Sequence, residues 1–386
     1  MTRLKRDEPA TLNSSLSPVH SRSLRKLGMV LAGVATLAGL GMAYGRLSGS
    51  TASLGDATIK PAQAKTPRKA ANCAPRPEAL QQELDRIAAS FQGKVGIGVT
   101  QAGCDWVVGA RQDEFFPQQS VSKLWVALSV LDAVDQGKVR LDQPLTLRPE
   151  DLVVFNQPMR WRLLEEGSLT LPVHSLLESS LSLSDNLAND KLLWTVGGPD
   201  HVRGVLKDRG LQGIRFGPGE RLLQSGIAGV EWKPELALAN NFNDARERLP
   251  LEQRQALLAR YVADPMDGAT PAGISKALGQ LAMGDLLSPA NTQVMLDIMA
   301  HSRSGPRRLK GGAPAGWKVY HKTGTGQELR GLATGYNDVA VFQAPDGTSY
   351  GVAVMIGETR QPIPVRMEMM QAVSRAIAAA HDASRS

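Results

Sequence analysis

The sequence contains few of the residues that build metal and redox centres. Its 386 residues include only two cysteines and six histidines. The histidines stand apart, and no group of Cys and His has the spacing of metal ligands, so we expect no metal site. Charged residues make up only 21% of the chain against 42% hydrophobic residues, which indicates a globular protein able to bury a sizeable core.

The chain also lacks a clustered basic surface for nucleic acid, although its net charge is +7. Much of the excess positive charge lies ahead of residue 70 and the remainder is scattered. The basic residues of that stretch are Arg3, Lys5, Arg6, Arg22, Arg25, Lys26, Arg46, Lys60, Lys65, Arg68 and Lys69. No basic helix with interleaved aromatic residues follows, so we expect no nucleic-acid partner.

An apolar run from Leu27 to Tyr44 follows the basic residues Arg22, Arg25 and Lys26. Positive charge ahead of an apolar core is typical of an export signal or of a cytoplasm-in membrane anchor. The run is short for a bilayer span and long for a signal core, so both interpretations stay open. Either one predicts that the remainder is exported to the periplasm or cell envelope, tethered to the inner membrane or secreted after signal cleavage.

These features divide the chain into four segments. Residues 1–26 are predicted to be a basic cytoplasmic N-terminus, and residues 27–45 an anchor or signal sequence. Residues 46–76, rich in Ala, Lys, Pro and Thr, are predicted to be a flexible tether. Residues 77–383 then form the folded domain, and we expect membrane contact through the N-terminal segment only.

The two cysteines, Cys73 and Cys104, flank the first predicted strand region. In an oxidising compartment such an even pair can form a disulfide. The alternative is that they are two unrelated buried thiols.

Hydrophobic periodicity predicts strands near both ends of the folded domain and helices between them. The predicted strands are Lys94–Thr100, Trp106–Val108, Gly316–His321, Ala333–Gln343 and Tyr350–Gly357. The predicted helices are Pro77–Phe91, Ser120–Gln136, His174–Leu183, Leu187–Val196, Asp200–Arg209, Leu251–Val262, Thr270–Ala282, Pro289–Ala300 and Val365–Ala380. The stretch from Gly213 to Gly268 is expected to be a long glycine-bearing loop that holds the Leu251–Val262 helix.

This order of elements predicts an α/β (α+β) fold. An antiparallel sheet must bring the first and last strands together, with a mostly helical lobe inserted between them.

Ser120 and Lys123 open the most apolar helical pattern of the folded domain. Residues three apart share one face of a helix, so the lysine amine can reach the serine hydroxyl. A serine hydroxyl needs a neighbouring base, and a desolvated lysine can serve as one. The helix start also supplies N–H groups where an oxyanion would develop. By itself, a Ser-x-x-Lys pattern is only weak evidence.

Two further polar clusters are Ser184-Asp185-Asn186, which interrupts a helical pattern, and Lys322-Thr323-Gly324-Thr325, which follows a strand. A lysine on a strand edge suits binding of a substrate carboxylate. Taken singly, each cluster is more simply explained as a turn.

Ser-x-x-Lys, Ser-Asp-Asn and Lys-Thr-Gly in this order form the motif set of class A β-lactamases and penicillin-binding proteins. The chain resembles that superfamily from about Pro77 to Ala380, and the resemblance implies a β-lactamase/transpeptidase-like fold. Val196-Gly197-Gly198-Pro199 matches the family's Gly-Gly-Pro. In the same register, Glu220-Arg221-Leu222-Leu223-Gln224 matches its Glu-x-x-Leu-Asn motif, with glutamine replacing the asparagine.

A second register is possible, in which Trp232-Lys233-Pro234-Glu235-Leu236 occupies the omega loop and Lys233 replaces the catalytic glutamate. We favour Glu220 because that register needs no insertion before it. It requires instead an insertion of a few tens of residues between Gln224 and Thr270. Asp267 then resembles the aspartate that closes the omega loop, while its usual arginine partner falls on Pro218, so the closing ion pair is missing or rebuilt.

The resemblance implies a mechanism. Ser120 attacks the carbonyl of a β-lactam ring, and the N–H groups of Ser120 and Thr325 form the oxyanion hole. Lys123, Glu220 through a water, or both take the Ser120 proton, and Ser184 passes a proton to the leaving nitrogen. Glu220 then activates water to release the product.

The same resemblance assigns Lys322 and Thr323, aided by Arg330, to the substrate carboxylate, and Asn186 to the side-chain amide. The implied substrate-binding residues are Asn186, Gln224, Lys322, Thr323, Gly324, Thr325 and Arg330. No cofactor or metal is required.

Three functions remain open. The first is a serine β-lactamase that hydrolyses a small β-lactam substrate through an acyl-serine, a role in antibiotic resistance. The second is a D,D-peptidase that acts on peptidoglycan stem peptides. The third is a non-hydrolytic β-lactam-binding protein, which would follow if Lys233 holds the deacylation position. For each we expect a monomer.

Overall fold

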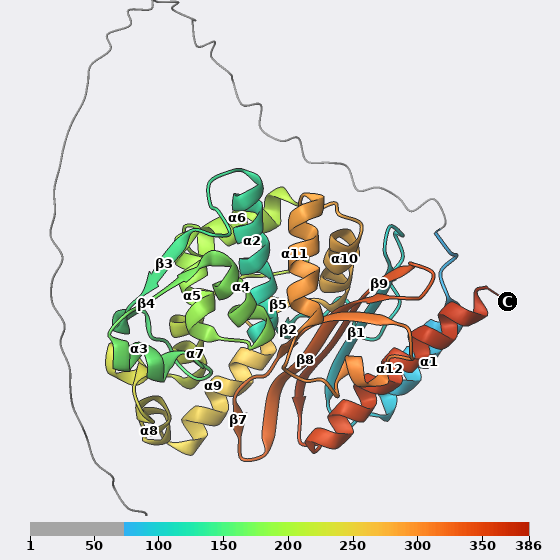
Figure 1. Ribbon diagram of the computed structural model, residues 1–386. Helices are drawn as coiled ribbons and strands as arrows, with labels where there is room; N and C mark the ends of the chain where they lie inside the picture. The colour runs from blue at the N-terminus through green and yellow to red at the C-terminus, as the bar shows by residue number, and fades with distance from the viewer. Residues whose placement is uncertain (1–72, 386) are drawn as a thin grey trace, which may run out of the picture. The chain divides into compact units, whose positions relative to one another are not determined.

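The computed structural model describes residues 73–385 of the chain (Figure 1). Residues 1–26, residues 27–45 and nearly all of the predicted tether lie outside the described residues. Among the residues that are described, no helix combines the length and the apolar character needed to cross a bilayer.

A five-stranded antiparallel sheet forms the centre of the folded domain. In spatial order its strands are β1 (Lys94–Gln101), β9 (Ser349–Thr359), β8 (Leu332–Gln343) and β6 (Lys318–Gly324), with β7 (Glu328–Leu329) also paired to β8. Val99 of the first strand lies opposite Val352 of the last. The prediction that the sheet joins the two ends of the domain is therefore confirmed.

Each face of the sheet belongs to a different core because side chains alternate along a strand. Val352 and Val354 of β9 pack with α1 (Glu78–Ser90) and α12 (Ile363–Ala383). Ala353 and Met355 of the same strand belong to the larger core, which also contains the helical lobe.

The helical lobe is built around α2 (Lys123–Asp135), which is buried along nearly its whole length and has nine apolar residues among its 13. The other helices of this region are α3 (Arg160–Glu166), α4 (Val173–Ser182), α5 (Asn186–Thr195), α6 (Pro199–Asp208), α10 (Pro271–Ala282) and α11 (Pro289–Ala300). The short pairs β2 (Phe116–Pro117) with β5 (Gly268–Ala269) and β3 (Pro144–Leu147) with β4 (Leu169–Pro172) complete it. Side chains cap several helix starts, as Thr270 does for α10 and Ser288 for α11.

The predicted strand Trp106–Val108 is not a strand. Val108 and Val99 exchange backbone hydrogen bonds, but they form only an isolated bridge. The N–H of the next residue, Gly109, donates to the Gln81 side chain of α1 rather than to the sheet. Beyond Gly109 the pairing continues with one bond, from the N–H of Ile97 to the carbonyl of Ala110, which does not extend the bridge into a strand.

The predicted loop from Gly213 to Gly268 is largely helical. Besides α9 (Leu251–Ala263), close to the predicted helix, it contains α7 (Glu220–Ala228), α8 (Asn241–Glu247) and a 3₁₀ turn, Pro234–Ala237. These helices are too short for a strong periodic signal, and tertiary packing stabilises them. Leu223 of α7, for example, packs in a small core with residues of α9.

Cys73 and Cys104 form a disulfide, with their Cα atoms 5.4 Å apart. The bond joins the start of the described chain to the turn that follows β1. The disulfide interpretation of the two cysteines is confirmed, and the alternative of two separate thiols is wrong.

Replacing both cysteines by serine should lower the free energy of unfolding by about 3–4 kcal/mol, the chain-entropy value for a loop of this length. Urea unfolding of the full chain, with wild type under reducing conditions as the control, measures the effect. Equal midpoints for oxidised wild type and the C73S/C104S variant would contradict a stabilising role for the bond.

Candidate active site

The proposed nucleophile lies in a 3₁₀ turn, Gln119–Ser122, that leads directly into α2. Lys123 Nζ donates to Ser120 Oγ at 2.8 Å and to Asn186 Oδ1 at 2.8 Å. Burial lowers the pKa of Lys123, although the carboxylates of Glu220 and Asp190 act in the opposite direction. A lysine with a lowered pKa can accept the proton of a hydroxyl that already touches it.

The Ser-Asp-Asn cluster is the start of α5. The Asp185 carboxylate accepts the N–H groups of Leu187 and Ala188 and thereby caps the helix. Ser184, just before it, has a left-handed φ of 59°. This sharp turn lets Ser184 and Asn186 line one cleft while Asp185 is buried in the lobe.

Lys322 lies on β6 and is fully buried. Its Nζ donates to Ser184 Oγ at 2.9 Å and to the carbonyl of Thr323. Burial, then the charges of Lys123 and Arg308, lower the pKa of Lys322 well below its usual range. Ser184 therefore connects a strand of the sheet to the helical lobe at the cleft.

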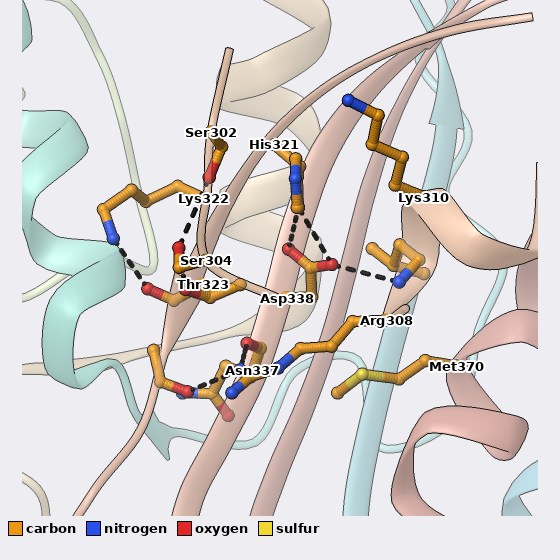
Figure 2. A network of polar contacts seen from close by, with 12 residues as sticks. Ser302, Ser304, Arg308, Lys310, His321, Lys322, Thr323, Asn337, Asp338 and Met370 are labelled. Carbon is orange, nitrogen blue, oxygen red and sulfur yellow. Dashed lines mark hydrogen bonds and ion pairs between the residues drawn. The ribbon is translucent and has the colours of Figure 1, made fainter. Parts of the chain in front are cut away.

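Figure 2 shows the polar network behind this strand. The Arg308 guanidinium donates to the carbonyls of Gly324 and Asn337 at 3.0 and 2.6 Å, and to Thr325 Oγ1 at 2.8 Å. The Asp338 carboxylate accepts from the N–H of the residue after Arg308 and from His321 Nδ1, each at 3.0 Å. These contacts hold the positively charged Arg308 guanidinium beside Thr325.

The expectation that Arg330 aids carboxylate binding is wrong. Arg330 is at the exposed turn between β7 and β8, where it does not line the cleft and its carbonyl accepts a bond from Arg360. Arg308 holds the position beside Thr325 instead. It comes from a segment with no motif or periodicity, so sequence reasoning had no signal for it.

Glu220 is the first residue of α7, and its carboxylate accepts from Asn186 Nδ2 at 2.8 Å. Asn186 thus connects Glu220 to Lys123 and, through it, to Ser120. Burial raises the pKa of Glu220, and Lys123 and a hydrogen bond from Gln224 lower it. Lys233, the alternative residue at the deacylation position, is exposed and does not line the cleft.

The Gln224 side chain is buried and forms hydrogen bonds with neighbouring side chains. Its Nε2 donates to Gln119 Oε1 and its Oε1 accepts from Gln327 Nε2, each at 3.0 Å. The longer side chain of glutamine is therefore used to join the nucleophile turn to the strand edge.

Asp267 is fully buried and forms no ion pair in the described part of the chain. Its carboxylate accepts the N–H of Gln119 at 2.7 Å and the hydroxyl of Tyr261 at 2.8 Å. Burial raises the pKa of Asp267 to about 6. The expectation that the ion pair closing the omega loop is missing or rebuilt is confirmed. Pro218 occupies the position of the usual arginine, and Tyr261 of α9 bonds to Asp267 instead.

The cleft between these elements has a volume of about 500 Å³. Predicted site residues that line it are Ser120, Ser184, Asn186, Glu220, Gln224, Thr323 and Thr325. Lys123 and Lys322 are buried just behind its surface. Gly324 is needed for close approach, since a Cβ there would lie 2.3 Å from the carbonyl oxygen of Gln118. Asn243, Arg246, Ser304 and Arg308 also line the cleft and were not predicted.

In this cleft a buried lysine is hydrogen-bonded to a serine, and a carboxylate and a second lysine lie nearby. This arrangement is typical of a serine hydrolase that works through an acyl-enzyme. Comparison with known proteins agrees. The sequence profile described as the beta-lactamase enzyme family matches residues 79–381. The chain belongs to this family, within the class A serine β-lactamase superfamily, and is a serine hydrolase that acts on β-lactams.

Two relatives illustrate the similarity. A β-lactamase of Rhodobacter capsulatus is 28% identical over 356 residues, which are 92% of this chain and 99% of the relative. Beta-lactamase VEB-1 of Pseudomonas aeruginosa is 25% identical over 301 residues, 77% of this chain and 88% of its own.

Solved structures agree in fold. A β-lactamase from Chitinophaga pinensis is 25% identical with a TM-score of 0.64, covering 78% of this chain and 99% of its own. An ancestral class A β-lactamase is 30% identical with a TM-score of 0.60, at the same coverage.

Asp190, which accepts the N–H of Glu220, should make stability depend on pH. Burial, then the charge of Glu220, raise the pKa of Asp190 from 3.8 to about 7. In this window the folded protein holds a proton that the unfolded chain has lost, so stability falls as pH rises. Asp190→Asn keeps the acceptor and removes the titration, so its stability relative to wild type should increase from pH 4 to pH 7.

Thermal unfolding at several pH values measures this difference, with the exposed Asp208→Asn as the control. A constant difference between D190N and wild type across the range would show that Asp190 is ionised throughout.

Proposed function

We propose that Ser120 is the residue acylated by the β-lactam and that Lys123 takes its proton. The 2.8 Å contact between Lys123 Nζ and Ser120 Oγ carries this proposal. Bonding of Oγ to the ring carbonyl carbon gives a tetrahedral intermediate, and the carbonyl–nitrogen bond breaks when this intermediate collapses to the acyl-serine. Ser184 donates its proton to the departing nitrogen and regains the one that Lys123 took from Ser120, so both groups return to their starting states, while Lys322, which already donates to Ser184 Oγ, holds that hydroxyl in place.

The tetrahedral intermediate carries an oxyanion that the backbone N–H groups of Ser120 and Thr325 stabilise. The substrate carboxylate binds near Thr323 and Thr325. Arg308 and Lys322 supply positive charge there, and Arg308 takes the place first expected for Arg330.

Glu220 activates the water that hydrolyses the acyl-enzyme. Its carboxylate lines the cleft and bonds to Asn186, which also bonds to Lys123. The exposed position of Lys233 argues against a protein that only captures its ligand. We therefore favour turnover over trapping.

Replacing Glu220 by glutamine should leave acylation measurable and slow deacylation by about 10²- to 10⁴-fold, the usual contribution of a general base. Intact-mass spectrometry should then detect an accumulated penicilloyl adduct, and nitrocefin should give a stoichiometric burst.

Lys233→Ala is the matched control and should turn over like wild type. Ser120→Ala should abolish labelling by a fluorescent penicillin. Undiminished turnover in E220Q, or surviving label in S120A, would refute the respective role.

We further propose that the chain is exported and acts as a monomer outside the cytoplasm. Basic residues ahead of the apolar run Leu27–Tyr44 support export, and the disulfide between Cys73 and Cys104 suits an oxidising compartment. The N-terminal segment is then the only part that contacts the membrane.

Fractionation of a Gram-negative host that expresses the full chain should place it in the inner membrane, or in the periplasm with a shortened N-terminus. Mass spectrometry of the recovered protein distinguishes these two forms. A full-length cytosolic pool with reduced cysteines would contradict export.

A further inference from the structure

The inserted segment, residues 225–266 between Gln224 and Asp267, forms part of the cleft wall. Its helix α8 contributes Asn243 and Arg246 to the lining. One turn before Arg246 and on the same face of the helix, the Phe242 ring packs edge-on against Phe155, which also lines the cleft, at 5.1 Å between centroids. The helix is therefore anchored to the part of the cleft wall that carries Phe155, and this contact holds Asn243 and Arg246 at the cleft.

Arg246 has no anionic partner in the part of the chain that the structure describes. One terminal nitrogen donates to Gln327 Oε1 at 2.9 Å, and its buried Nε bonds to nothing. A second guanidinium, that of Arg254, lines a small neighbouring cavity with Arg246, and its buried Nε is likewise unpartnered. Arginine stays protonated in proteins, so two positive charges lie together, and neither forms an ion pair with a carboxylate of the described residues.

The surroundings of Arg246 disfavour its charge. Burial, then the charge of Arg254, lower the pKa of Arg246, and only Glu247 acts in the opposite direction. Glu328 lines the same two cavities but makes no ion pair with either arginine. An anion that entered the cleft at this point would lie next to the Arg246 guanidinium and would relieve the repulsion between the two cations.

The position of Arg246 along the cleft identifies which part of a substrate it can reach. Its partner Gln327 is two residues beyond Thr325, which is about 7 Å along an extended chain. In a bicyclic β-lactam, the ring carboxylate and the acylamino group are on opposite sides of the reacting carbonyl. If Thr323 and Thr325 hold the carboxylate, the acylamino side chain extends past Gln327 toward α8.

We propose that Arg246 is a specificity-determining residue that binds a carboxylate on the acylamino side chain of the substrate. This rests on the proposed placement of the ring carboxylate at Thr323 and Thr325. The preferred substrates are then β-lactams with two carboxylates, one on the ring system and one on the acyl side chain. The inserted segment supplies this selectivity.

The test compares two penicillins that differ only by this group, α-carboxybenzylpenicillin and benzylpenicillin. The second-order rate constant for acylation of the full chain is measured for each by quenched-flow mass spectrometry. Arg246→Ala should reduce this constant for the dicarboxylate by about ten- to one-hundred-fold, as expected when a charge-assisted hydrogen bond is lost. The constant for benzylpenicillin should stay within about two-fold.

Arg246→Lys should retain part of the preference, because it keeps the charge but not the planar fork. Arg248→Ala, an exposed residue at the end of the same helix, is the control and should change neither constant. Glu328→Gln should increase the preference for the dicarboxylate by removing a nearby negative charge.

If R246A lowers the acylation rate constant equally for both penicillins, Arg246 has a structural role through Gln327. If R246A lowers it for neither, Arg246 does not take part in substrate recognition. Either result overturns the proposal. Because acylation is measured, failure of the deacylation step would refute hydrolysis by Glu220 without affecting this comparison.

Discussion

The burial of the Lys123 ammonium is the constraint around which the cleft is organised. An unpaired charge in a protein interior is costly, so the group must lose its proton or be surrounded by acceptors. Here Ser120 Oγ and Asn186 Oδ1 accept directly, while Glu220 and Asp190 supply negative charge nearby. The same burial raises the pKa of both carboxyl groups. Burial thus lowers the pKa of the lysine and raises the pKa of the carboxyl groups. A proton can move between groups whose pKa values have been brought closer together, and the chemistry depends on this.

A second set of contacts keeps the nucleophile turn in a conformation that it would not adopt alone. Gln119, directly before Ser120, has a left-handed φ of 53°. Asp267, Tyr261 and Gln224 hold its backbone and side chain by hydrogen bonds. Two of these residues flank the inserted segment and the third belongs to it. The insertion therefore closes the loop that carries Glu220, supports the turn that carries Ser120 and extends the cleft wall.

Much of the site could be predicted because its residues occur in motifs with defined spacing. Ser120, Lys123, Ser184 and Lys322 were found this way, and counting from Ser184 favoured Glu220 over Lys233. The long, strongly periodic elements were predicted well, such as α11 and β8. Residues brought in by tertiary structure alone could not be predicted. Arg308 reaches Thr325 only because Asp338 and the sheet position it, and Arg246 lies on a helix of seven residues that packing holds in place.

Acylation at Ser120 is tested most directly by peptide mapping of the wild-type chain after acid quench during its reaction with benzylpenicillin. Acid arrests the acyl-enzyme before release, and proteolysis followed by tandem mass spectrometry identifies the modified side chain. We expect a single penicilloyl ester on Ser120, next to Lys123. An ester on Ser184 or on any other residue, or hydrolysis with no covalent intermediate at any quench time, would contradict it.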